Sequence, residues 1–211
     1  MSEPIAFDDT ELLKKFTTPS LKVNLKITDL KTMKCHHTWL WTFKNIKLEP
    51  QDKLFFGIEG DIPQNFEDLN LKIHDEKDRK LQVEKLEDKP LEKSFNVKLE
   101  RPIKFNREQT IKLEYDWDEP KMNYVMYPSY GGFDKIDFSF SIPKNANVDA
   151  RLFKLHSGSK SLVFIPTPIK IKKLKNTISI KGNMKRVLAT KECLKFYWRI
   201  KKTRTKKVSK K

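Results

Sequence analysis

The sequence predicts an all-β protein, an antiparallel β-sandwich of the immunoglobulin-like or a related type with about ten strands. Apolar and polar residues alternate with a period of two in short segments spread over most of the chain. No long segment has the apolar spacing of an amphipathic helix. Proline, glycine and charged turn residues separate the alternating segments.

Residues 1–20 are expected to form an N-terminal extension with one short helix. Asp8 can cap this helix, which would run through Leu12 and Phe16. The β-sandwich domain is expected to occupy residues 21–203, and no internal repeat divides it.

The alternating segments predict strands in chain order. Two of them, 69–73 and 81–86, are separated by charged residues at 75–78 and are therefore predicted to form a hairpin. The remaining segments are 21–27, 39–48, 54–58, 95–99, 111–117, 136–142, 152–155, 162–165, 169–174, 178–180 and 194–200.

The segment 118–133 differs from the rest because it combines two prolines and a Gly-Gly pair with many large side chains. It reads as a long connection, and long connections often carry function. Its tyrosines, Tyr124, Tyr127 and Tyr130, suit an interface. The alternative is that the segment folds back and closes the end of the core.

The C-terminal charge is the strongest clue to function. Residues 170–211 hold 17 Lys or Arg and one acid, so they carry the whole formal charge of +16. In the last strand, Phe196 and Trp198 would face the core while Tyr197 and Arg199 face solvent. Residues 204–211 hold a single apolar residue, Val208, and are predicted to be a disordered basic tail.

This pattern predicts a non-enzymatic binding or interaction module that docks an anionic macromolecule. An acidic protein surface, nucleic acid and an anionic membrane surface all satisfy the charge. The alternative function is sequence-nonspecific binding of DNA or RNA, in which Tyr197 or the three loop tyrosines stack on bases. Exposed strand lysines also prevent edge-to-edge aggregation, which is a purely structural interpretation. The candidate contact residues are Lys170, Lys172, Lys173, Lys195, Arg199, Lys201, Lys202, Arg204, Lys206 and Lys207.

Catalytic and metal-binding signatures are weak. The sequence contains no Gly-x-Ser-x-Gly, phosphate-binding loop or dinucleotide fingerprint, so no catalytic residue and no cofactor is predicted. Cys35, His36, His37 and Cys193 lack the paired spacing of a zinc site. A hydrolase using loop carboxylates stays a lesser alternative, and its candidates are Asp75, Glu76, Asp78, Asp116, Asp118 and Glu119.

The location of the protein is predicted from its ends and its cysteines. The N-terminus has neither a basic start nor an apolar run, and no stretch reaches the ~20 apolar residues that span a bilayer. Two cysteines cannot form a disulfide framework. We therefore expect an intracellular protein, cytoplasmic or, in a eukaryote, nuclear. The oligomeric state cannot be predicted.

Overall fold

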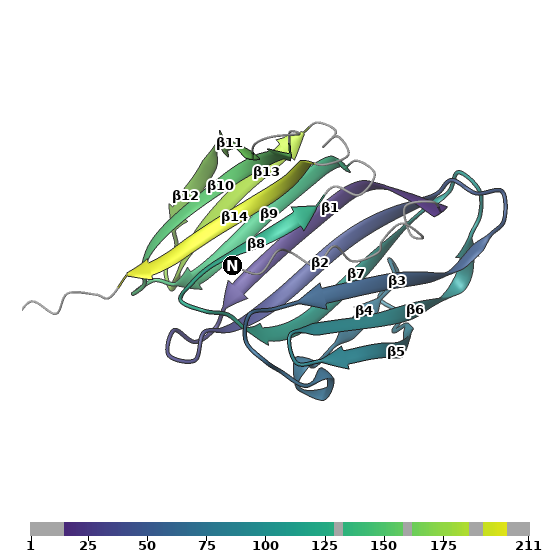
Figure 1. Cartoon of the computed structure of the whole chain (residues 1–211), viewed down its shortest axis with the longest axis horizontal. Helices are drawn as coiled ribbons and strands as arrows, with labels where there is room; N and C mark the ends of the chain where they lie inside the picture. Colours follow the sequence, from purple (N-terminus) through teal and green to yellow (C-terminus); the bar gives the residue numbers. More distant parts are fainter. Residues whose placement is uncertain (1–14, 129–132, 158–161, 186–191, 202–211) are drawn as a thin grey trace, which may run out of the picture.

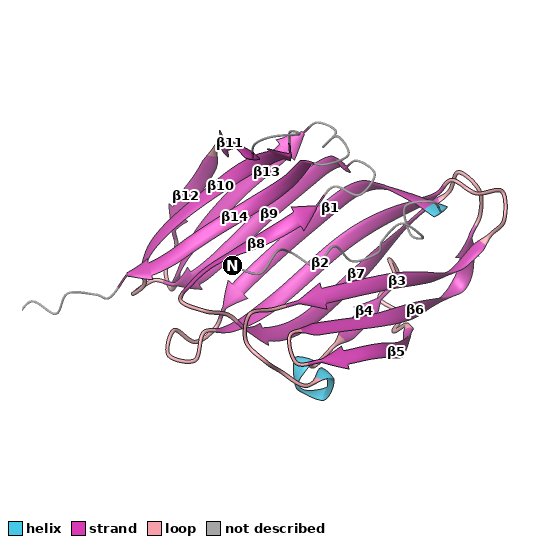
Figure 2. Ribbon diagram, viewed as in Figure 1, coloured by secondary structure: helices cyan, strands magenta, loops and turns pink. Residues whose placement is uncertain are grey.

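The computed structural model describes residues 15–128, 133–157, 162–185 and 192–201. Side chains at 124–128, 133, 155–157, 162–164, 185 and 192–194 lie outside this description. The described chain is all-β, with three sheets and a short 3-10 helix at Phe66–Leu69 (Figures 1 and 2). The strands are β1 Phe16–Ile27, β2 Lys34–Asn45, β3 Gln51–Glu59, β4 Lys72–His74, β5 Gln82–Lys89, β6 Glu92–Ile103, β7 Glu108–Asp118, β8 Met122–Pro128, β9 Phe133–Pro143, β10 Asn147–Ser157, β11 Leu162–Thr167, β12 Ile169–Lys173, β13 Thr177–Lys185 and β14 Glu192–Lys201.

The largest sheet has seven strands in the order β12-β13-β9-β1-β2-β7-β4. Its central pair, β1 and β9, is parallel, whereas every other pair of described strands in this sheet is antiparallel. The sheet is therefore mixed, which corrects the prediction of an antiparallel protein. Period-two alternation reports which face of a strand is buried and says nothing about the direction of its neighbour.

One face of this sheet is apolar across its whole width. The register places Phe138, Val23, Trp39 and Leu113 side by side on four adjacent strands. Residues two positions away along each strand repeat the pattern, because successive side chains point to opposite faces. The opposite face carries Lys, Ser, Thr, Asn, Asp and Glu.

Two smaller sheets cover the apolar face side by side (Figure 1). The four-stranded sheet β11-β10-β14-β8 places Phe196 and Trp198 against β1, β9 and β13, and the Phe196 ring lies 4.2 Å from that of Phe138. The three-stranded sheet β3-β6-β5 places Phe56 and Phe95 over β2, β7 and β4. Two apolar clusters result, one beneath each small sheet.

Trp39 and Trp41 of β2 lie between the two clusters. Both are half-buried and pack against both cores. Their rings lie 6.0 Å apart, and the Trp41 ring is stacked on Phe43 at 5.1 Å. These large rings lie where the two clusters meet, so β2 contributes side chains to both cores.

Three expectations for individual elements need correction. Phe16, predicted to lie in a helix, is the first residue of β1, while the part of that helix before residue 15 falls outside the described residues. The predicted connection 118–133 contains a strand, β8, which pairs with β14. The predicted hairpin does not form: β4 pairs with β7 and β5 pairs with β6, in different sheets. Only an isolated bridge between His74 and Lys80 joins its two arms.

Candidate functional site

The solvent-facing surface of the four-stranded sheet gathers the basic residues of the last strand. On β14, Phe196 and Trp198 are buried, whereas Arg199 and Lys201 are exposed and Tyr197 is half-buried. The alternation predicted for this strand is therefore confirmed. Buried and solvent-facing side chains alternate along this strand because Phe196 and Trp198 pack into the core beneath it.

Strand pairing adds residues from β10 to this surface. Arg151 lies opposite Tyr197, and Asp149 lies opposite Arg199. Asp149 Oδ2 is 3.6 Å from Arg151 Nη2 and 4.0 Å from Lys201 Nζ, so one carboxylate lies between two cations. Both cationic side chains keep more than half of their exposure. Ion pairs this exposed contribute little to stability and leave the cations able to bind a partner.

We define the basic β10–β14 face by its described members Asp149, Arg151, Lys195, Tyr197, Arg199 and Lys201. Its four cations and one carboxylate give it a net charge of +3. The sequence continues from Lys201 into the basic C-terminal residues, so the face is followed directly by more positive charge. On the other side of β14, β8 places the backbone of Tyr124 opposite Tyr197.

The predicted lysines of β12 lie elsewhere. Lys170 pairs with Lys181 and Lys172 with Ser179 on the polar outer face of the seven-stranded sheet. Lys173 is exposed and is opposite Ile178 at the sheet's edge. The two sheets pack through their inner faces, so Lys170 and Lys172 point away from the basic β10–β14 face. Alternation along a strand shows which residues are exposed to solvent, but it does not show which sheet the strand joins.

Several predicted contact residues cannot be placed. Lys202, Arg204, Lys206, Lys207 and Tyr130 lie outside the described residues. Tyr124 and Tyr127 belong to β8, but their side chains also lie outside the description. Arg151 was missed because it precedes the basic C-terminal segment and reaches the face only through pairing with β14.

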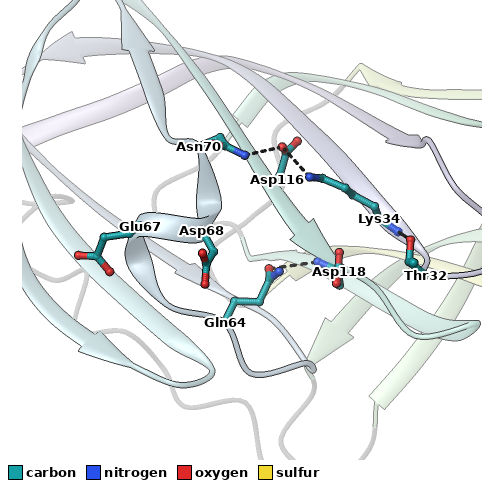
Figure 3. A pocket seen from close by; sticks show the side chains of 8 residues that line it. All are labelled: Thr32, Lys34, Gln64, Glu67, Asp68, Asn70, Asp116 and Asp118. Carbon is teal, nitrogen blue, oxygen red and sulfur yellow. Dashed lines mark hydrogen bonds and ion pairs between the residues drawn. The ribbon is translucent and has the colours of Figure 1, made fainter.

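A pocket of about 420 Å³ lies at the end of β7, next to the 3-10 helix (Figure 3). Its lining is polar, with four acids among eight residues and one cation, Lys34. The lining residues are Thr32, Lys34, Gln64, Glu67, Asp68, Asn70, Asp116 and Asp118. Gln64 Oε1 accepts a hydrogen bond from the backbone N–H of Asp118 at 3.1 Å, which holds the helix segment against β7.

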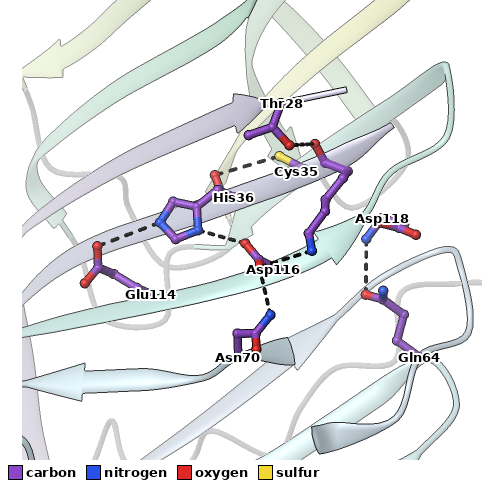
Figure 4. Close-up of polar contacts among 9 residues, drawn as sticks. Thr28, Cys35, His36, Gln64, Asn70, Glu114, Asp116 and Asp118 are labelled. Atoms are coloured by element: carbon purple, nitrogen blue, oxygen red, sulfur yellow. Dashed lines mark hydrogen bonds and ion pairs between the residues drawn. The ribbon is translucent and has the colours of Figure 1, made fainter. Parts of the chain in front are cut away.

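Asp116 is the best-connected acid in this pocket (Figure 4). It lies 2.8 Å from His36 Nδ1, accepts from Asn70 Nδ2 at 3.0 Å and is 3.6 Å from Lys34 Nζ. Burial raises the pKa of Asp116, but the bonds from His36 and Asn70 and the Lys34 charge outweigh it, so the pKa is lowered. This carboxylate is ionised and held by three neighbours, which suits a structural role better than that of a hydrolytic acid.

A second polar cluster is buried on the inner face of β2. His37 Nε2 lies 3.3 Å from Glu119 Oε1, and both side chains are 5% exposed. Asn123 donates to the other Glu119 oxygen at 2.9 Å, and the Tyr115 ring stacks on His37 at 4.5 Å. Burial, and then the Glu119 charge, raise the pKa of Tyr115 and of the Cys35 thiol well above their usual values. Both groups are therefore neutral and unsuited to nucleophilic chemistry.

The predicted turn acids and cysteine–histidine group are also placed. Asp75 is buried rather than solvated, because Arg79 Nε donates to it at 2.8 Å. His36 and His37 contact partners on opposite faces of β2. Across the residues the structure describes, no group of three or more His, Cys, Asp or Glu is placed to hold a metal ion. Nor does this part of the chain contain a helix that could span a membrane.

No protein-family model and no curated protein matches this sequence. Solved structures nevertheless share its fold. An M1 zinc metallopeptidase from Deinococcus radiodurans aligns with 86% of this chain at a TM-score of 0.55 and 10% identity. A putative protease from Parabacteroides distasonis aligns with 87% at a TM-score of 0.56 and 5% identity. The chain spans 42% and 40% of those two proteins, and at such identities the likeness concerns the fold alone.

Proposed function

We propose that this chain is a two-layer β-sandwich that acts inside the cell as a non-catalytic binding module. Its binding surface is the basic β10–β14 face, and its partner is an anionic macromolecule. One observation carries the proposal: four cations from two paired strands share an open sheet surface with Tyr197, and the acid among the described members of that face, Asp149, already lies between two of them.

Charge is the main source of the proposed affinity. A surface with clustered cations and few acids lowers the free energy of a polyanion near it and raises the rate of encounter. The basic C-terminal sequence that follows Lys201 extends the same positive potential. Contacts of this kind give affinity and orientation without sequence specificity.

Among anionic partners, Tyr197 favours single-stranded nucleic acid over an acidic protein. It is half-buried in the middle of a four-stranded sheet, with Arg151 beside it on β10. Exposed aromatic rings on a sheet, flanked by arginine and lysine, are the arrangement that stacks bases and holds phosphates. An acidic protein would use the same cations but would depend less on the Tyr197 ring.

The proposal is tested by fluorescence anisotropy of a labelled single strand of mixed sequence, in DNA and RNA, with the full chain. Arg199→Glu combined with Lys201→Glu is expected to weaken binding at least tenfold and to flatten the salt dependence. Each phosphate contact contributes a slope of about −0.7 in log Kobs against log[salt] for single strands. Tyr197→Ala is expected to weaken binding by about five- to a hundredfold, as for loss of one stacked base.

The matched control is Lys170→Glu with Lys172→Glu, which changes the same charge on the opposite side of the molecule. Equal losses in both double variants would mean that net charge alone drives binding, and the assigned face would be wrong. Loss with the β14 variant but no effect of Tyr197→Ala, together with tighter binding of an acidic peptide, would identify an acidic protein as the partner.

A further inference from the structure

The loop between β2 and β3, residues 46–50, and the loop between β6 and β7, residues 104–107, lie together at one end of the molecule (Figure 1). We call them the loop tip. It exposes three large apolar side chains: Leu48 is 78% exposed, Phe105 52% and Ile46 43%. Among the described large hydrophobic residues, Leu48 is the most exposed. Apolar groups gathered on neighbouring loops mark an interaction site more often than scattered ones do.

The loop tip is held in shape by Asn45, which is fully buried at the end of β2. Its Nδ2 donates to Glu49 O in one loop at 3.0 Å and to Ile103 O at the base of the other at 2.7 Å. Its Oδ1 accepts from the Lys47 backbone N–H at 2.7 Å. The Asn106 N–H also donates to Asn45 O at 2.8 Å. Leu48 and Phe105 are thus presented by a fixed backbone, which reduces the entropy lost on binding.

Cations accompany the apolar side chains. Lys47, Lys104 and Arg107 are exposed on the two loops, against one acid, Glu49. Among the described residues none of these three cations forms an ion pair within the chain. The loop tip therefore offers apolar groups with positive charge around them, and no described acid forms an ion pair with that charge.

We propose that the loop tip docks on an anionic bilayer surface, with Leu48 and Phe105 entering the headgroup region and the three cations contacting lipid phosphates. A membrane suits this surface because the apolar side chains stand on protruding loops rather than in a groove, and lipids rearrange around a protruding group. The cytoplasmic leaflet is anionic, and each Lys or Arg near it strengthens binding by about 1 kcal/mol, a fivefold change in affinity. This surface is distinct from the basic β10–β14 face.

The test is flotation of the full chain with vesicles of phosphatidylcholine alone or with about 30% phosphatidylserine. Leu48→Ser with Phe105→Ser is expected to lower affinity for the anionic vesicles at least tenfold, because burying a Leu or Phe side chain is strongly favourable. Lys47→Ser with Lys104→Ser is expected to lower it by about 25-fold. Exposed substitutions of this kind leave folding intact, which thermal unfolding verifies.

The matched control is Ile171→Ser with Leu174→Ser, which removes two other apolar groups around β12 that are each more than half exposed. It should retain binding to the anionic vesicles. The basic C-terminal sequence also attracts anionic lipid, so the decisive comparison is made at raised salt, where screened contacts weaken and inserted apolar groups persist. Vesicle binding that both apolar double variants retain in full would overturn the proposal. Absence of vesicle binding, or a dimer that Leu48→Ser with Phe105→Ser abolishes, would overturn it as well.

Discussion

Asn45 offers a sharp test of how the loops at the end of the molecule are fixed. Its side chain makes three hydrogen bonds, and their partners show which side-chain atom is the nitrogen. Two backbone carbonyls require a donor, and the Lys47 N–H requires an acceptor. Asn45→Ala removes all three. At about 1 kcal/mol each, with the buried Ile103 carbonyl left without its partner, the free energy of unfolding should fall by about 3 kcal/mol.

Asn45→Asp separates hydrogen bonding from packing. Aspartate has nearly the same shape and keeps the acceptor for Lys47, but it turns a carboxylate oxygen towards Ile103 O, where the amide nitrogen was 2.7 Å away. It should therefore be less stable than Asn45→Ala at neutral pH, despite filling the space. Protonating the introduced carboxyl restores one donor, so the difference should narrow as the pH falls.

The measurement is urea unfolding of the three proteins at neutral and acidic pH. For a chain of this size, a loss of 3 kcal/mol also lowers Tm by roughly 6–12 °C. If Asn45→Asp were as stable as the wild type at neutral pH, the amide would not be the donor to the two carbonyls. The account of the loop tip as a hydrogen-bonded unit would then be wrong.

Three further predictions concern the core beneath the three-stranded sheet. Gly60→Ala should destabilise the fold by about 2–4 kcal/mol in urea unfolding, because a Cβ there would lie 2.1 Å from Trp117 Nε1. Gly182→Ala should destabilise it less, because the atom nearest to the added Cβ is the terminal methyl Cδ2 of Leu152. Lys93 is fully buried, its Nζ is 3.0 Å from Asp88 Oδ1, and it also donates to the Lys89 carbonyl. Lys93→Met should stay within about 1 kcal/mol of the wild type, while Asp88→Asn, which leaves the buried ammonium without an opposite charge, should be clearly destabilising. The hydrogen bond from Lys93 lowers the pKa of Asp88 in the folded state. The ionised Asp88 therefore stabilises the fold above its unfolded-state pKa of about 4, and this contribution is lost as the pH falls below that value. Thermal unfolding as a function of pH should show a smaller acid-dependent loss of stability in Lys93→Met.

Much of the strand content could be predicted from the sequence, because alternation records burial directly. Val23, Phe138 and Phe196 all lie on the apolar faces that the pattern indicated. The segment containing β8 could not be recognised, since its prolines and glycines resemble a connection. Turn chemistry at 75–78 suggested a hairpin, yet the chain leaves one sheet and enters another after the buried Asp75. Sheet membership depends on long-range partners, which local pattern does not contain.

The candidate site was predicted in part for the same reason. Tyr197 and Arg199 were assigned to the solvent-facing side of the last strand, and the structure places them there. Arg151 joins them only through the register of β10 with β14. Lys170 and Lys172, which belong to the same basic segment of the sequence, lie on the other side of the molecule because β12 belongs to the seven-stranded sheet. Charge counted along a chain does not reveal how that charge divides between faces.

The parallel pair β1–β9 has a consequence for how the molecule assembles. Val23 of β1 pairs with Phe138 of β9, more than 100 residues later in the chain. During synthesis β1 can pair with β2 at once, but its other edge stays unpaired until β9 is made, and β13 then pairs with β9. Pairing over such sequence distances is slow, and until then the unpaired edge of β1 can associate with other nascent chains. Chaperone capture during translation should therefore be strongest after β2 is made and should decline once β9 emerges.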